Sequence, residues 1–148
     1  MATDKQLLGN RGEQLVVKLG SCPKCKRKKT FKALPANFKC ADVICDFCGY
    51  QAQVKATTVA DPAKLPATIP GAAWRPQKER MDAGIFFPLY IVAEAKNGPS
   101  AVYFLPADFQ TFEMFKPRKP LSETARRAGW QGFVIDLRLA LSAPVRLL

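Results

Sequence analysis

Four cysteines arranged as two Cys-x-x-Cys pairs constrain the fold of this chain more than any other feature. Cys22 and Cys25 form the first pair, Cys45 and Cys48 form the second, and 19 residues separate the pairs. Two residues between thiolates let the backbone turn around a metal ion, while the longer stretch returns the chain to it, as in a zinc ribbon. The sequence therefore predicts one structural Zn²⁺ held by these four thiolates.

Disulfide bonds are the competing interpretation of the cysteine pattern. The cysteine count is odd, at five, and the N-terminus lacks the basic start and apolar stretch of a secretory signal. These two observations favour zinc. The fifth cysteine, Cys40, is expected to be a small buried hydrophobic residue.

The apolar runs of the chain are short. The longest, at 85–95, is interrupted by Pro88 and Glu94, and it falls short of the roughly 20 apolar residues that a membrane span requires. We therefore expect a soluble cytoplasmic protein that has no membrane partner.

A strong positive charge is the first indication of function. Lysine and arginine total 23 against 12 acidic residues, a net charge of +11, and this balance favours polyanionic partners. Much of the charge lies in two clusters, one beside the first cysteine pair and one nearer the C-terminus: Lys24, Lys26, Arg27, Lys28, Lys29 and Lys32, then Lys116, Arg118, Lys119, Arg126 and Arg127. No amphipathic helix gathers these residues beside exposed aromatics, so we expect nucleic acid rather than a membrane surface.

The first half of the chain predicts one helix and two strands. Thr3 or Asp4 can cap a helix that ends at Gly20. Short strands are expected at 38–44 and 50–58, on either side of the second cysteine pair, with loops at 21–33 and 59–73.

The second half predicts a short helix at 74–81 and two apolar strands at 85–95 and 101–105, joined by an Asn-Gly turn. A basic loop at 115–120, a brief helix at 123–128 and a last strand at 133–139 complete the chain. This order predicts a single α/β domain over 1–148, with a mixed sheet flanked by helices.

The chain has no histidine, so histidine-based catalysis is excluded. Three other residues are candidates for catalysis. Gln53 and Lys55 share one face of a predicted strand, because alternate side chains of a strand point the same way. Asp42 closes the preceding strand. If the two strands pair, its carboxylate approaches the same edge.

This arrangement resembles the core of the PD-(D/E)XK nucleases, in which an acidic residue precedes an acid-x-Lys triplet on the next strand. The resemblance implies that Asp42 and Gln53 hold a catalytic Mg²⁺ and that Lys55 helps to generate and orient a hydroxide. Gln53 replaces the second acid, and an amide oxygen can coordinate Mg²⁺ but supplies no charge, so Mn²⁺ is the alternative ion. Glu13 is a fourth catalytic candidate, because a glutamate on the N-terminal helix often completes metal binding in this superfamily.

The C-terminal segment 120–137, and above all the run Thr-Ala-Arg-Arg-Ala-Gly-Trp at 124–130, resembles the catalytic domain of DpnI-like, Dam-replacing restriction endonucleases. There too, one Cys-x-x-Cys pair precedes the catalytic aspartate and a second follows it. The resemblance implies a restriction-endonuclease-like fold and a double-stranded DNA substrate, with N6-methyladenine GATC sites as the expected targets. Members of the family also carry a C-terminal winged-helix domain, which we do not expect within these residues. A partner molecule could supply the sequence recognition that the winged-helix domain provides in the family.

The candidate DNA contacts come from the two basic clusters. Lysines and arginines beside the first cysteine pair are typical of a sequence-independent phosphate clamp, and those near the C-terminus would hold further phosphates: Lys26, Arg27, Lys28 and Lys29, then Arg126 and Arg127. Trp130 could wedge between bases or simply close a turn as a buried aromatic.

Two other functions compete with a nuclease. A zinc-containing DNA-binding module whose nuclease site has decayed would carry Gln53 as its lesion. A nucleic-acid-binding zinc ribbon without nuclease ancestry would not explain the C-terminal resemblance. The sequence leaves open the recognised bases and the oligomeric state.

Overall fold

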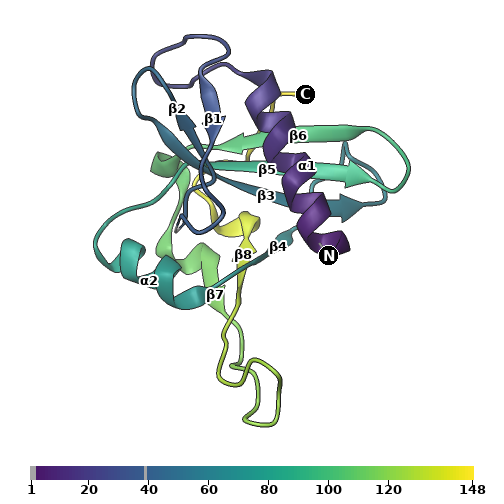
Figure 1. The fold of residues 1–148 in the computed structure, drawn as a ribbon, viewed down its shortest axis with the longest axis vertical. Coiled ribbons are helices and arrows are strands. Elements are labelled where there is room, and N and C mark those ends of the chain that lie inside the picture. The colour runs from purple at the N-terminus through teal and green to yellow at the C-terminus, as the bar shows by residue number, and fades with distance from the viewer. Residues whose placement is uncertain (1–2, 39) are drawn as a thin grey trace.

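A six-stranded mixed sheet forms the centre of the computed structural model, which describes residues 3–38 and 40–148 (Figure 1). Its strands, in spatial order, are β1 (Phe31–Ala33), β2 (Val43–Cys45), β3 (Gln51–Val59), β5 (Leu89–Ala95), β6 (Ser100–Leu105) and β9 (Val145–Arg146). β3 and β5 pair in parallel, and the other neighbours pair antiparallel. A second sheet of three antiparallel strands has the order β4 (Thr68–Gly71), β8 (Phe133–Asp136) and β7 (Phe115–Pro117). The predicted mixed α/β architecture is confirmed.

Two α-helices flank these sheets within the described residues: α1 (Asp4–Leu19) and α2 (Trp74–Asp82). Thr3 begins α1 with a capping box, in which its hydroxyl accepts from the Gln6 amide and the Gln6 side chain accepts from the Thr3 amide. Gly20 ends α1 in the left-handed region, with a φ of 64°. Three short 3-10 helices follow later in the chain: η1 (Ala107–Phe109), η2 (Phe112–Met114) and η3 (Leu137–Leu139). No described helix combines the length and apolar character that a membrane crossing requires.

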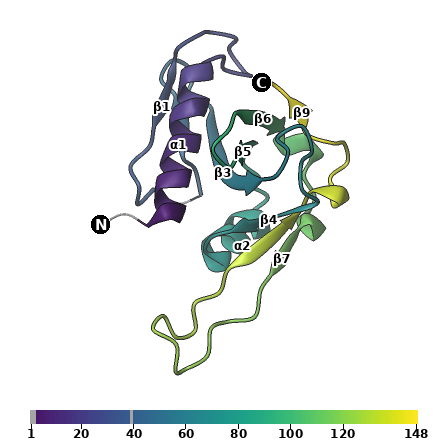
Figure 2. The same cartoon turned by 90° about the vertical axis from the view of Figure 1, so that its right-hand side faces the viewer.

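The large sheet has an apolar core on each face. Along β5, Leu89, Ile91 and Ala93 belong to one cluster, which includes α2 and the small sheet, whereas Tyr90 and Val92 belong to the other, which includes α1, β1 and β2. This alternation follows from the two-residue period of a strand. α1 and the small sheet therefore cover opposite faces of β5, as Figure 2 shows.

The cysteine-rich first half departs from prediction at two places. The loop predicted over 21–33 ends in β1, because Phe31 is buried and packs edge-on against Tyr90 at 6.0 Å. The strand predicted over 38–44 is wrong at its start: β2 begins at Val43. Phe38 is exposed in a turn, and Cys40 has a φ of 68°, which no strand residue adopts. Lys39 lies outside the described residues.

The second half contains the larger errors. The loop predicted over 59–73 contains β4, and β9 was not predicted at all. The helix predicted over 123–128 is wrong. Residues 118–132 instead form an arm that projects away from the body of the molecule (Figures 1 and 2). This segment has no apolar face to bury, and a helix of six residues is unstable without packing. The last strand ends at Asp136 rather than at 139, because η3 follows.

Two glycines of α1 provide a matched test of how closely the helix lies on the sheet. A Cβ at Gly12 would lie 2.9 Å from the Ala56 Cβ, whereas a Cβ at Gly9 would meet nothing within 4 Å. We expect Gly12→Ala to lower the free energy of unfolding by about 1–3 kcal/mol and Gly9→Ala to raise it by about 0.5–1 kcal/mol. Urea denaturation of both variants measures the difference. Equal effects of the two substitutions would contradict this packing.

Candidate metal centre and candidate active site

The two cysteine pairs meet in space and form a candidate metal centre. The sulfur atoms of Cys22, Cys25, Cys45 and Cys48 all lie within 4.8 Å of one another. Cys22 Sγ lies 3.6 Å from Cys48 Sγ, and Cys25 Sγ lies 3.7 Å from Cys45 Sγ. Ligands of a tetrahedral zinc ion, at bond lengths of about 2.3 Å, lie about 3.8 Å apart. The four thiols therefore fit a structural metal such as zinc.

The backbone around these cysteines is folded into tight turns. The Lys26 amide donates to the Cys22 carbonyl, and the Gly49 amide donates to the Cys45 carbonyl. Lys26 and Gly49 both adopt left-handed conformations, with φ values of 66° and 79°, which the turns require. The same local geometry therefore recurs after each cysteine pair, as the spacing predicts.

The environment of Cys45 favours its thiolate. Burial acts to raise the pKa of this thiol, but hydrogen bonds from the Thr30 hydroxyl and from backbone amides of the second turn outweigh it and lower the pKa to about 6. The Thr30 oxygen lies 3.1 Å from the sulfur. A thiolate is the form that binds metal.

A pocket of about 300 Å³ holds the three residues that sequence analysis selected for chemistry. Asp42, Gln53 and Lys55 all line it. α2 and Phe133 of β8 contribute further walls. The Lys55 Nζ lies 5.9 Å from the centre of the Phe133 ring, which places the cation above an aromatic face. The predicted pairing of the two strands thus brings these three side chains to one place.

Asp42 is fixed to β3 by two hydrogen bonds. Its backbone amide donates to the Ala52 carbonyl at 2.9 Å, and its carboxylate oxygen Oδ2 accepts from the Val54 amide at 2.7 Å. The second bond orients the carboxylate beside Gln53 and Lys55, which flank Val54 in sequence. A carboxylate has two oxygens with lone pairs, so Oδ1 can ligate a cation while Oδ2 holds the Val54 amide.

Gln53 is almost fully buried, with an exposed fraction of 3%, and its amide is paired with a residue that sequence analysis missed. The Gln53 Nε2 donates to the Gln77 Oε1 at 2.9 Å. Gln77 is equally buried and lies on α2 between Trp74 and Met81, the other two buried residues of that helix. A polar residue at helical spacing within an apolar face was the signal that could have identified Gln77.

Glu13 lies outside this pocket but close enough to interact with it. It lines a separate groove beside α1 and β1. Burial raises the pKa of its carboxyl, the negative charge of Asp42 raises it further, and the positive charge of Lys55 lowers it. Glu13 therefore interacts electrostatically with Asp42 and Lys55 but does not share their pocket.

Cys40 also lines the pocket and is half-buried, so the prediction of a buried hydrophobic residue is wrong for this position. Its left-handed backbone carries the chain from the turn after β1 into Asp42. It is not one of the four residues of the candidate metal centre among the described residues.

The basic cluster beside the first cysteine pair lies on the surface. Its members Lys24, Lys26, Arg27, Lys28, Lys29 and Lys32 are all exposed. Arg27 stacks over the exposed ring of Phe47, with its guanidinium carbon 3.8 Å from the ring centre. This contact joins the tips of the two cysteine turns into one basic surface.

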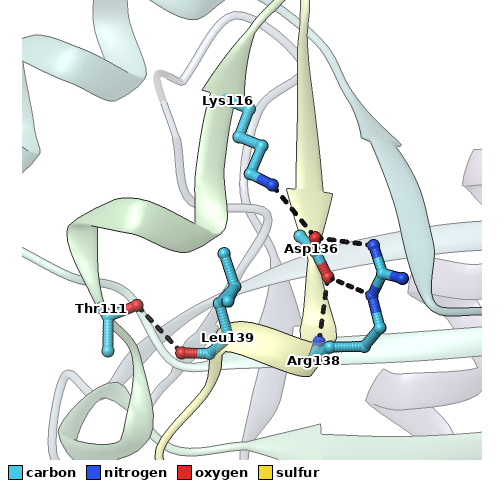
Figure 3. Close-up of polar contacts among 5 residues, drawn as sticks. All are labelled: Thr111, Lys116, Asp136, Arg138 and Leu139. Atoms are coloured by element: carbon cyan, nitrogen blue, oxygen red, sulfur yellow. Dashed lines mark hydrogen bonds and ion pairs between the residues drawn. The ribbon is translucent and has the colours of Figure 1, made fainter.

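The second basic cluster is divided between the arm and the small sheet. Arg126 and Arg127 lie in turns of the arm and are exposed, and Arg127 stacks over the half-buried Trp130 at 4.6 Å. Lys116 belongs to β7 and is instead bound to Asp136 (Figure 3).

Asp136 is the most heavily bonded acid of the described residues. It is 3% exposed and accepts from the Lys116 Nζ at 3.2 Å and from the side chain and backbone amide of Arg138. The Arg138 hydrogen bonds are the main reason that the pKa of this carboxyl is far below its usual range. Asp136 thus ties β7 to the end of β8, and this bond makes Lys116 less available to a ligand.

The fold and these sites define an α/β protein with a candidate four-cysteine metal centre, a polar pocket and exposed basic surfaces. Comparison with protein families matches residues 4–145 to the DpnI family, described as a Dam-replacing family. Because the match spans nearly the whole sequence, the chain belongs to this family. Membership associates the chain with methylation-related DNA function and with restriction-type nucleases.

Removing the metal tests the candidate metal centre. We expect purified protein to contain one zinc ion per chain. Chelation should lower the melting temperature by about 10 °C or more, because a loss of a few kcal/mol of binding energy corresponds to a shift of this size. Cys25→Ser and Cys48→Ser should each lose zinc, as measured by atomic absorption. Cys40→Ser is the matched control and should retain it; zinc loss in this variant would contradict the ligand set.

Proposed function

We propose that this chain is a Mg²⁺- or Mn²⁺-dependent endonuclease that hydrolyses phosphodiester bonds of double-stranded DNA, with N6-methyladenine GATC sites as its targets. The observation that carries the proposal is the shared pocket of Asp42, which lies directly before β2, with Gln53 and Lys55 of the paired strand β3. Membership in the DpnI family supports both the nuclease chemistry and the DNA substrate.

The residues of the pocket can ligate the divalent cation that the proposed phosphodiester hydrolysis requires. Asp42 offers the carboxylate oxygen Oδ1 and Gln53 offers its amide oxygen, and oxygen ligands are those that Mg²⁺ and Mn²⁺ accept. The bound cation would polarise the scissile phosphate as a Lewis acid. Glu13 lies near enough to contribute negative charge to the same neighbourhood.

Lys55 would act directly on the reacting atoms. Its ammonium group can donate hydrogen bonds to a phosphate oxygen and to the attacking water, and its charge stabilises the negative charge that develops on the phosphate. The water oxygen then adds to phosphorus while one P–O ester bond breaks, and a proton from the water ends on the departing oxygen, which leaves as an alcohol. The zinc centre would hold β2, and with it Asp42, in place without contacting the substrate.

The exposed basic residues would hold the DNA backbone. The segment 24–32, which carries the first basic cluster, lies at the end of the molecule with β1 and β2, whereas the arm 118–132, which includes Arg126 and Arg127, lies at the opposite end (Figure 1). Cationic side chains at both ends suit phosphate contacts that position a duplex without reading its sequence. Trp130, beside Arg127, would contact the bases or the sugar edge nearby.

A DNA-binding module with a degenerate site is the second candidate. It is favoured by Gln53, because this residue stands where a charged acid is expected and its amide is already bonded to Gln77. Cutting in the presence of metal distinguishes the two candidates. Both share the fold, the zinc centre and the basic surfaces.

Plasmid cleavage tests the proposed enzyme. We expect supercoiled plasmid carrying N6-methyladenine at GATC to be cut in Mg²⁺ or Mn²⁺, and unmethylated plasmid to be cut more slowly. Lys55→Ala should lower the rate about a hundredfold or more, and Asp42→Asn should have a similar effect. Lys96→Ala, in the exposed turn between β5 and β6, is the matched control. Cutting by Lys55→Ala at the rate of Lys96→Ala would contradict the proposal, and salt-sensitive binding without cutting would favour the DNA-binding module.

Salt dependence tests the basic surface beside the metal centre. We expect Lys28→Ala to weaken binding to duplexes of any sequence and to reduce the slope of log K against log salt by about 0.9, because each phosphate contact releases condensed counterions. Fluorescence anisotropy in a non-hydrolysing buffer, across a salt series, gives the slope. Lys96→Ala should leave it unchanged. Equal slopes for both variants would exclude a phosphate contact at Lys28.

A further inference from the structure

The buried amide pair of Gln53 and Gln77 raises a question that the proposed chemistry leaves open. A glutamine can ligate a cation only through its oxygen, because its NH₂ group has no lone pair to offer. The two orientations of an amide group have nearly the same shape. Something must therefore hold the Gln53 amide so that its oxygen, rather than its nitrogen, faces the cation site.

We infer that Gln77 is a positioning residue that fixes the orientation of the Gln53 amide for cation binding. The inference rests on the proposed function, because it concerns the same pocket. Gln77 Oε1 accepts from Gln53 Nε2 at 2.9 Å, so the nitrogen is turned towards α2 and the oxygen is the atom left to serve as a ligand. Both side chains line the pocket with Asp42 and Lys55.

Burial makes the hydrogen bond between Gln53 and Gln77 costly to break. Both residues are 3% exposed, so water cannot readily replace the partner of either amide. An unsatisfied buried donor costs far more than an exposed one. Turning the Gln53 amide alone would set its oxygen against the Gln77 oxygen and would lose the bond, so the orientation of Gln53 is tied to that of Gln77. The cost holds the ligand orientation before any cation arrives, and partners of this kind typically change metal affinity by 10- to 100-fold when they are removed.

The position of Gln77 on α2 keeps the bond in place. Trp74 and Met81, three residues before it and four after it, are buried in the core on the same side of the helix. Trp74 packs against Phe133 at 5.8 Å. The helix therefore cannot turn Gln77 away without exposing two large apolar side chains. α2 thereby connects the small sheet to the pocket on β3.

Calorimetric titration of the zinc-loaded protein with Mn²⁺, without DNA, tests the inference. Gln77→Leu removes the acceptor at similar size, and we expect it to weaken Mn²⁺ binding about tenfold or more. Gln77→Glu keeps an acceptor and should retain the wild-type affinity or exceed it. Glu79→Leu, on the exposed side of α2, is the control for a leucine substitution in this helix. Zinc content and melting temperature show whether each variant is folded.

A second background separates positioning from simple packing. In Gln53→Glu, both terminal atoms of side chain 53 are oxygens, so either orientation presents an oxygen ligand to the cation. Gln77→Leu should therefore change the Mn²⁺ affinity of that background by no more than about twofold. Equal losses in both backgrounds would overturn the inference, because Gln77 would then support the fold rather than the amide. A folded Gln77→Leu protein with unchanged Mn²⁺ affinity would overturn it as well.

The calorimetric result is independent of the cleavage result. A chain that binds Mn²⁺ in a Gln77-dependent manner but cuts no DNA would refute the proposed enzyme and support the positioning role. If the chain cuts DNA but Gln77→Leu leaves its Mn²⁺ affinity unchanged, the positioning role alone would be overturned.

Discussion

The antiparallel pairing of β2 with β3 is the constraint on which the rest of the molecule depends. β2 has three residues, and two of the metal-binding cysteines lie at or just beyond its end, at Cys45 and Cys48. Asp42 lies directly before its start and is bonded to β3 through both its backbone amide and its carboxylate. A strand this short has little pairing energy of its own. The Asp42 bonds hold it in register at one end, and a metal bound by the four cysteines would do so at the other.

In this arrangement, a metal bound by the four cysteines would influence the pocket without contacting it. A shift of β2 by one residue would turn every side chain to the opposite face of the sheet and would break the bond between Asp42 and Val54. A metal bound by all four cysteines would fix the position of Cys45 and, with it, the register of β2. Such a metal would serve the proposed chemistry by holding the Asp42 carboxylate in place, consistent with the alternation of cysteine pairs and catalytic candidates along the sequence.

Sequence patterns predicted the elements whose signals are local. The capping box and Gly20 define α1, the cysteine spacing defines the metal centre, and the two-residue period of β3 places Gln53 and Lys55 on one side. The missed elements depend on distant partners. β4 is a strand because Ile69 pairs with Ile135, and β1 is one because Phe31 meets Tyr90, contacts that no local pattern encodes. The helix predicted over 123–128 is wrong because a capping serine and helix-forming residues do not stabilise so short a helix when it has no apolar face to bury.

Gln77 escaped prediction because its place in an apolar helix face marks it as a buried polar residue but does not reveal its partner. Its pairing with Gln53 also bears on whether the pocket has decayed. Replacing two buried, mutually bonded amides by apolar residues of the same shape is often neutral or stabilising, so the stability of the core gives no reason to keep this pair. The proposed cation site would give such a reason, because it would need an oriented amide oxygen beside Asp42. The substitution of an acid by Gln53 is then one half of a two-residue arrangement, in which the hydrogen bond from α2 supplies the orientation that a carboxylate would not need.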